Sequence, residues 1–190
     1  PSSPAVVDTH DSRAADSLLH VATRAATLFV VTAASRAYLE TTGESVLGLD
    51  AFHTHLAAAA RTGRPVLTVS NHMSVYDDPI ILSYIAPRAA YTTAPWRHRW
   101  GGCSEEICFK HPALAAFFGA GKVLPVWRGG GLSQPMFAEL ADHLCVPGSW
   151  VHLFPEGCIC QRHLNHSDVP ARRRPYLRWG VGKMIARAHA

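Results

Sequence analysis

Three short apolar runs, each followed at once by polar or turn-forming residues, constrain the fold of this chain most strongly. They occupy residues 66–69, 123–127 and 150–154 and are rich in Val, Leu and Trp. Short apolar runs bounded by turn residues are typical of buried strands. Helical segments separate the runs, and strands that alternate with helices form a mostly parallel sheet. The sequence therefore predicts an α/β fold in which a mostly parallel sheet is flanked by helices.

Periodicity and the positions of Gly and Pro predict the other elements. Helices are expected over residues 49–61, 79–85, 134–144 and from about residue 176 onward, with helical turns at 105–110 and 112–118. A fourth, short strand is expected at 89–93, and loops are expected at 96–102 and 129–131.

Three segments organise the chain. Residues 1–16 mix Ser, Pro, Ala, Asp and Thr without periodicity, which predicts a flexible leader. Residues 17–40 are expected to form an apolar helix whose uninterrupted apolar stretch is about half of the ~20 residues that span a bilayer. This helix either packs on the domain or lies in a membrane interface, with Arg24 and Arg36 reaching the headgroups. Residues 41–190 form the main domain, which is expected to be truncated at the C-terminus.

The composition favours a partner with negative charge and apolar surface. Hydrophobic residues make up 48% of the chain and charged residues 17%, whereas about 25% charged residues is usual for soluble domains. The net charge is +4. An anionic membrane surface or an acidic metabolite fits this balance. Aromatic residues are not interleaved with a basic stripe, so nucleic acid is not expected as a partner.

The cysteines predict neither a disulfide framework nor a metal site. They are five in number and irregularly spaced, which favours a reducing or mixed compartment. Cys158 and Cys160, followed by His163 and His166, suggest zinc at first sight. The one-residue gap between these cysteines is shorter than the two to four residues that separate paired cysteines in zinc sites, and no second cysteine pair accompanies them. No metal is therefore expected.

A histidine and a carboxylate follow the first apolar run in the pattern Asn71-His72-x4-Asp77. Asp77, Asp78 and Pro79 form a helix-start signal. Across a strand–turn–helix corner the side chains of His72 and Asp77 can meet, and a histidine held by a carboxylate can remove a proton from a hydroxyl at neutral pH. The alternative is that Asp77 is only a helix cap and His72 a surface imidazole.

Polar residues follow three of the predicted strands, and parallel sheets bind ligands beyond the carboxyl ends of their strands. His72, Arg128 and Glu156 are therefore expected to converge on one rim. Arg128 can offer forked donors to a phosphate, and Glu156 can accept hydrogen bonds from a polyol or orient an arginine. The alternatives are a surface arginine and a solvated turn carboxylate.

Motifs of other enzyme classes are missing from the sequence. It has no phosphate-cradling loop, no Gly-x-Ser-x-Gly nucleophile elbow and no Gly-x-Gly-x-x-Gly turn after a strand. A nucleotide cofactor and a covalent serine nucleophile are therefore not expected.

Two signatures in this order, Asn71-His72-x4-Asp77 and Phe154-Pro155-Glu156-Gly157, resemble those of the glycerolipid (lysophospholipid) acyltransferase superfamily. Within it the chain is most similar to the tafazzins. The further segments that carry this resemblance are Asp77-Asp78-Pro79, Glu106-Ile107-Cys108-Phe109, Gly121-Lys122, Pro125-Val126, Arg128-Gly129, Trp150-Val151-His152 and Arg178-Trp179-Gly180-Val181-Gly182. They lie between residues 65 and 185.

The resemblance implies acyl transfer between a phospholipid and a lysophospholipid, without coenzyme A or another cofactor. It further implies cardiolipin remodelling by a peripheral or monotopic protein of a mitochondrial membrane. His72 would be the general base and Asp77 its orienting partner. Substrate binding would fall to Asn71, Arg128, Glu156 and Gly157.

One departure from the pattern affects the second signature. Tafazzins usually have Lys after Glu-Gly, where this chain has Cys158. The missing positive charge is expected from Arg172, Arg173, Arg174 and Arg178, unless these form only a solvated basic loop.

Two other functions stay open. One is a lysophosphatidate acyltransferase that depends on acyl-coenzyme A. The other is an inactive scaffold that binds membranes.

Overall fold

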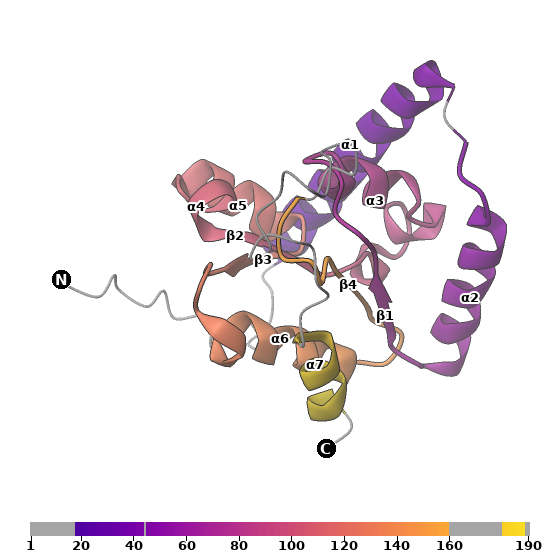
Figure 1. Cartoon of the computed structure of the whole chain (residues 1–190). Helices are drawn as coiled ribbons and strands as arrows, with labels where there is room; N and C mark the ends of the chain where they lie inside the picture. Colours follow the sequence, from indigo (N-terminus) through magenta and orange to yellow (C-terminus); the bar gives the residue numbers. More distant parts are fainter. Residues whose placement is uncertain (1–17, 44, 160–179, 189–190) are drawn as a thin grey trace, which may run out of the picture.

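The computed structural model describes residues 18–43, 45–159 and 180–188. Its centre is a parallel sheet (Figure 1). Strand β1 (Val66–Val69) pairs with β4 (Trp150–Leu153), and β2 (Gly101–Ser104) pairs with β3 (Val123–Val126), both in parallel. A parallel bridge between Trp100 and Val151 joins the two pairs. The strand order is therefore β1-β4-β2-β3, and the predicted α/β fold with a parallel sheet is confirmed.

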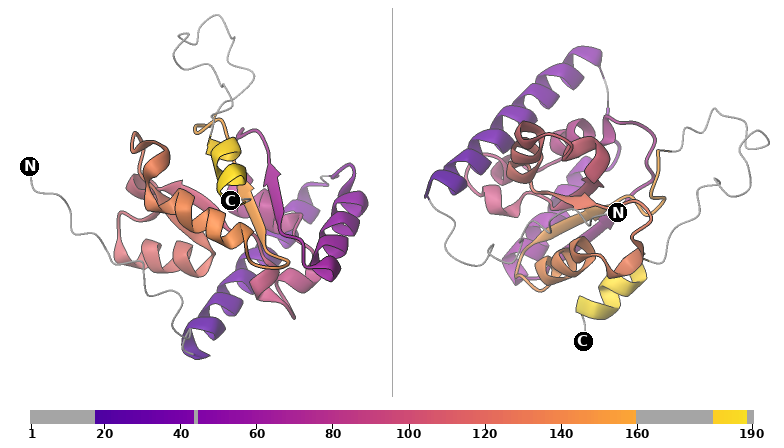
Figure 2. Two further views of the ribbon diagram at one scale, coloured as in Figure 1. Left: turned by 90° about the horizontal axis from the view of Figure 1, so that it is seen from below. Right: turned by 90° about the vertical axis from the view of Figure 1, so that its left-hand side faces the viewer.

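Helices lie on both sides of this sheet, as the two views in Figure 2 show. The helices are α1 (Leu18–Thr42), α2 (Leu49–Thr62), α3 (Leu82–Tyr84), α4 (Glu105–Cys108), α5 (Pro112–Ala120), α6 (Pro135–Leu144) and α7 (Gly180–Ala188). Shorter helical turns are η2 (Asp77–Ile81), η3 (Arg88–Ala90), η4 (Pro95–Arg97) and η5 (Gly131–Ser133). Helices α1, α3 and α5 lie on one side, and α6 and α7 lie on the other.

The main core lies between the sheet and α6. Helix α6 begins at Pro135, which suits the first turn of a helix because its missing N–H would have no partner there. One face of α6 is buried against the strands. The core residues are Leu124, Met136, Leu140, Ala141, Leu144, Val151 and Met184. This packing fixes the carboxyl ends of β3 and β4, where polar side chains were predicted.

Helix α1 packs on the domain with an unusual distribution of side chains. It buries Leu28 and Leu39 but also Thr32 and Ser35, while Leu19 and Val30 are exposed. By length and composition alone, α1 is long and apolar enough to cross a membrane. The predicted apolar helix is present; it packs one face on the domain and exposes apolar side chains on the other.

The predicted strand at residues 89–93 is wrong. These residues lie in η3 and the following turn, where the N–H groups of Thr93 and Ala94 donate to the carbonyl of Ala89. The fourth strand, β2, lies instead in and just after the predicted loop at 96–102. A Cβ on Gly102 would lie 2.8 Å from Val126 Cγ2, so close packing against β3 requires glycine there. Propensity gave no sign of this strand because tertiary pairing creates it.

One disulfide is present that the sequence analysis, which predicted no disulfide framework, did not expect. Cys103 in β2 and Cys108 in α4 form a disulfide, with Cα atoms 6.1 Å apart. Because β2 runs directly into α4, the chain reverses and brings the two together. Cys145 and Cys158 are exposed. The cysteine count therefore no longer argues for a reducing compartment.

Several predictions lie outside the described residues. They concern the leader at 1–16, residues 176–179 of the last predicted helix, and the side chains of Cys160, His163, His166, Arg172, Arg173, Arg174 and Arg178. Within the described ranges, no group of three or more His, Cys, Asp or Glu side chains could hold a metal ion.

Candidate active site

The turn after β1 brings His72 and Asp77 together, as expected for a strand–turn–helix corner. The carboxylate of Asp77 stands at the start of η2 and accepts the Nδ1–H of His72 over 2.9 Å. The same oxygen, Oδ2, accepts the backbone N–H groups of Met73 at 2.6 Å and Ser74 at 3.0 Å. One carboxylate oxygen therefore fixes both the imidazole ring and the backbone of the turn.

This contact decides which nitrogen of His72 can act as a base. Because Nδ1 faces a carboxylate, it carries the proton, and the lone pair is left on Nε2. The ring stacks on Phe154 with centroids 4.1 Å apart and planes inclined by 18°. The side chains of His72 and Asp77 are 20% and 18% exposed. The ring is thus held on one face and one edge, while the site remains open to a substrate.

The second signature supports the first through the backbone. Glu156 Oε2 accepts the N–H of His72 at 3.3 Å. Glu156 follows β4 in a turn that closes with the Gly157 N–H donating to the Phe154 carbonyl at 3.1 Å. Gly157 has φ +67°, a left-handed conformation that favours glycine. The structure therefore places Glu156 against the turn after β1, where it steadies the backbone of His72.

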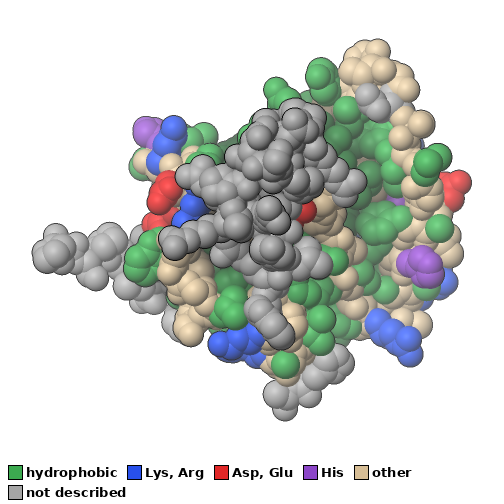
Figure 3. Space-filling model, viewed as in Figure 1, with side chains coloured by type: hydrophobic (Ala, Val, Ile, Leu, Met, Phe, Trp, Pro, Cys, Tyr) green, Lys and Arg blue, Asp and Glu red, His purple; other side chains and the backbone are tan. Residues whose placement is uncertain are grey.

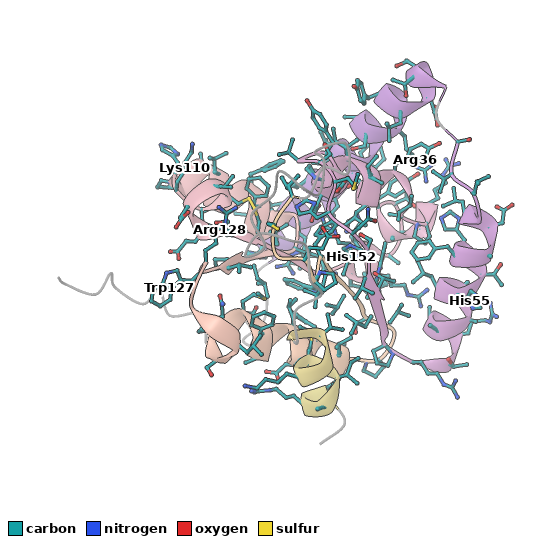
Figure 4. All side chains as sticks on the ribbon, in the orientation of Figure 1. Arg36, His55, Lys110, Trp127, Arg128 and His152 are labelled. Carbon is teal, nitrogen blue, oxygen red and sulfur yellow. A yellow bond between two sulfur atoms is a disulfide. The ribbon has the colours of Figure 1, made fainter. Side chains whose placement is uncertain are left out.

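His152, which the sequence analysis did not select, lies in the sheet beneath this turn (Figure 4). Trp150 Nε1 donates to Thr68 Oγ1 at 2.8 Å, and Thr68 Oγ1 lies 2.8 Å from His152 Nδ1. His152 Nε2 lies 3.3 Å from Ser70 Oγ, whose hydroxyl donates to the Asn71 carbonyl at 3.1 Å. With the proton of His152 on Nε2, every link has one donor and one acceptor. The chain of hydrogen bonds runs from the core to the residue before His72.

Burial keeps the His152 ring neutral. It lowers the pKa of His152 to about 3, and the positive charge of Arg99 and a weaker effect of His72 add to the shift. Asp77 opposes this shift. A neutral ring has one donor and one acceptor nitrogen, as the hydrogen-bond chain requires.

We expect this shift to make the protein less stable in acid. The unfolded chain binds a proton at His152 near pH 6.5, but the folded protein does so only near pH 3. The contribution is complete above pH 6.5 and is lost as pH falls toward 3. Between pH 8 and pH 5 the loss is about 2 kcal/mol for this one proton. The pKa of the buried His98 is lowered too and adds a loss of the same sign.

Urea unfolding of the wild type and of His152→Gln at the two pH values measures this. The variant should lose about 2 kcal/mol less than the wild type between pH 8 and pH 5. Equal losses would show that His152 does not carry the effect.

Two basic side chains are buried in the interior. They are Arg99, in the segment predicted as a loop, and Lys122, just before β3. Arg99 is 2% exposed; it pairs with Asp78 and donates to the Gly121 carbonyl at 3.3 Å. Lys122 Nζ donates to the carbonyls of Trp96 at 2.7 Å and His98 at 2.5 Å. Burial lowers the pKa of Lys122 well below its ordinary value, and the charges of Arg24 and Arg99 lower it further.

These contacts give a physical reason for the two adjacent acidic residues, Asp77 and Asp78, at the end of the first signature. Asp77 binds the imidazole of His72, and the adjacent Asp78 binds the buried guanidinium of Arg99. The start of η2 is therefore anchored to the turn after β1 by one carboxylate and to the buried Arg99 by the next.

Arg128 stands apart from this group. It is exposed just beyond β3, and Figure 4 shows it well away from His152. Strand β3 is at the opposite edge of the sheet from β1, about 14 Å away at the usual spacing between strands. The structure brings together His72, Asp77 and Glu156, with the exposed Asn71 on the same turn. It does not bring Arg128 to them.

A cavity in the described part of the chain lies elsewhere. It has about 120 Å³ and lies by the amino ends of β1 and β4, lined by Val66, Trp150 and side chains of α2. The dyad instead opens at the carboxyl rim, on the surface.

Comparisons with known proteins agree with the sequence signatures. The family model described as Acyltransferase matches residues 51–189. An N-acylphosphatidylethanolamine synthase of Arabidopsis thaliana is 40% identical over 134 residues, which are 70% of this chain and 43% of that protein. A tafazzin of Drosophila melanogaster is 35% identical over 127 residues, or 65% and 29% of the two chains. A tafazzin of Saccharomyces cerevisiae is 29% identical over 171 residues, or 74% and 43%. The chain spans less than half the length of each of these relatives.

Proposed function

The chain belongs to the acyltransferase family, and on that premise we propose that it moves an acyl chain from a phospholipid to the hydroxyl of a lysophospholipid. The observation that carries the proposal is the 2.9 Å contact between His72 Nδ1 and Asp77 Oδ2, which leaves Nε2 as an open base. Relatives named tafazzin support the choice of substrates. Remodelling of cardiolipin on a mitochondrial membrane is the finer form of this proposal, taken from the resemblance.

The reaction requires His72 to accept one proton from the acceptor lipid and later to donate it to the leaving alcohol. Nε2 of His72 takes the proton of the acceptor hydroxyl as its oxygen attacks the ester carbonyl of the donor lipid. The Asp77 carboxylate stabilises the imidazolium that forms. The tetrahedral intermediate then collapses, the ester bond of the donor breaks, and His72 returns the proton to the departing alcohol. The products are the acylated acceptor and a new lysophospholipid.

The oxyanion of that intermediate needs hydrogen-bond donors. Backbone N–H groups of the turn and of Gly157 are candidates for this role. Those of Met73 and Ser74 donate to Asp77, and that of Gly157 donates to the Phe154 carbonyl. We therefore assign the role to the exposed carboxamide of Asn71, which lies next to His72.

The position of Arg128 bears on which of the two lipids it would bind. The hydroxyl of a lysophospholipid lies close to its own phosphate, whereas Arg128 is about three strand spacings from His72. Its guanidinium is therefore better placed for the phosphate of the second, acyl-donating lipid.

A second candidate is N-acylation of phosphatidylethanolamine. The relative that supports it is the Arabidopsis thaliana protein named N-acylphosphatidylethanolamine synthase, at 40% identity. The same base would take a proton from the amine in place of a hydroxyl. The product would then be an amide, which resists mild alkali, whereas an ester is cleaved.

A transfer assay with vesicles tests the proposal. The vesicles contain a phospholipid labelled in its acyl chain, an unlabelled lysophospholipid and phosphatidylethanolamine, without coenzyme A. We expect alkali-labile label in the former lysophospholipid. Alkali-stable label would establish the N-acyl reaction instead. A parallel assay replaces the labelled phospholipid with labelled acyl-coenzyme A, and transfer only from that donor would establish the acyl-coenzyme A-dependent acyltransferase. Vesicle binding without transfer from either donor would establish the inactive scaffold.

A further inference from the structure

We propose that the loop between His72 and Asp77 is itself a membrane-docking element, in which Val75 and Tyr76 enter the lipid surface and hold the imidazole at it. The proposal rests on the proposed function and adds where the lipid surface meets the protein. Val75 is 63% exposed and Tyr76 59%. Two large apolar side chains thus stand in water at the tip of the turn that carries the dyad.

The backbone presents these side chains rigidly. Asp77 Oδ2 holds the N–H groups of Met73 and Ser74 on one side of the tip. The Tyr76 N–H donates to Ser74 Oγ at 3.1 Å. The Tyr76 carbonyl accepts the N–H groups of Ile80 and Ile81 at 3.1 and 2.9 Å. The loop is therefore fixed at both ends, and the exposure of its tip does not come from a loose backbone.

Helix α1 packs beside this loop and exposes apolar side chains of its own. It contacts η2, and at that level Leu28 and Val31 face Pro79. The same stretch of α1 exposes Phe29 and Val30. Figure 3 shows hydrophobic side chains toward the upper right of the molecule, where Figure 1 places α1 and α3. Since Leu28 and Val31 face η2, the exposed side chains of Phe29 and Val30 lie on the other side of α1, and the docking proposal rests on Val75 and Tyr76.

Charge around the loop also suits a lipid surface. The carboxylates of Asp77 and Asp78 are bound to His72 and Arg99 and are mostly buried, so they are shielded from phosphate headgroups. A tyrosine at the tip suits the interface, because its ring is apolar and its hydroxyl is polar.

The position of the loop favours lipid over a protein partner. A protein seated on Val75 and Tyr76 would cover His72, three residues away, and would exclude the substrate. Lipid supplies the ester itself. Side chains inserted about 5–10 Å below the headgroups would place His72 near the ester carbonyls.

The test uses the full chain with Val75→Ser and Tyr76→Ser combined. Acyl transfer is measured with long-chain lipids in vesicles of anionic phospholipid and with short-chain lipids dissolved as monomers. We expect the ratio of the vesicle rate to the monomer rate to fall on the order of tenfold, with a parallel loss of vesicle sedimentation. The matched control is Val46→Ser with Leu47→Ser, which removes exposed apolar side chains from the connection between α1 and α2. Its ratio should stay within about twofold of the wild type.

An unchanged ratio in the loop variant would overturn the proposal. So would an equal fall of both rates, which would mean that the side chains support the site itself. A wild type that transfers nothing either in the vesicles or between the dissolved lipids would instead refute the proposed function.

Discussion

Acyl transfer by the His72→Ala variant is expected to be about 10²- to 10⁴-fold slower than by the wild-type protein. The variant removes the lone pair on Nε2, the base that the contact with Asp77 leaves open. It also empties the space beside Phe154, on which the ring stacks. The turn itself should persist, because Asp77 still holds Met73 and Ser74 through their backbone N–H groups. Initial rates in the labelled-vesicle assay measure the effect.

The matched control is His55→Ala. His55 is exposed on α2 and points away from the sheet in Figure 4. Its loss should leave transfer unchanged. If both variants transfer label at the wild-type rate, the general-base role of His72 is wrong.

The largest effect on stability is expected for Arg99→Met. Removing one partner of a buried ion pair costs about 3–5 kcal/mol, since the remaining charge stays buried without compensation. Here Asp78 would lose its partner, and the Gly121 carbonyl would lose a donor. Such a loss is a large share of the ~5–15 kcal/mol that stabilises a typical domain. Urea unfolding at neutral pH measures it.

Arg97→Met is the control for this variant. Arg97 is two residues away but exposed, so the change should be within about 0.5 kcal/mol. Adding Asp78→Asn to Arg99→Met should recover part of the loss, because no carboxylate is then left unpaired. Equal midpoints for the wild type and Arg99→Met would show that the buried pair does not anchor η2.

The sequence predicted those parts of the fold that have a local pattern. Strands β1, β3 and β4 follow from apolar runs, and α6 follows from its apolar face and Pro135. Strand β2 has the sequence Gly-Gly-Cys-Ser, which carries no such pattern. It is a strand because Trp100 bridges to Val151 and because Gly102 allows close packing on Val126. Only the tertiary structure supplies these contacts.

In the candidate site, too, the sequence predicted local contacts but not contacts between distant parts of the chain. The meeting of His72 and Asp77 could be expected because a strand–turn–helix corner is a local structure. Arg99, Lys122 and His152 could not be selected, since sequence patterns place charged and polar residues at the surface. Their burial depends on distant partners such as Asp78 and Thr68.

The expected convergence of three strand ends depended on an unknown strand order. Glu156 follows β4, the direct neighbour of β1, and reaches His72. Arg128 follows β3, which is separated from β1 by two strands. Apolar runs alone do not reveal which strands are neighbours.

The most direct test of the dyad compares initial transfer rates for the wild type, Asp77→Asn and Asp77→Ala. The amide oxygen of Asn can still accept from His72, Met73 and Ser74, so that variant loses only the charge, about 1.5–3 kcal/mol or roughly 10- to 150-fold in rate. Asp77→Ala removes the acceptor for all three and should be slower still, approaching His72→Ala. That order is the predicted result. An Asp77→Ala protein that is folded and transfers acyl chains as fast as the wild type would contradict the claim that this carboxylate braces the catalytic imidazole.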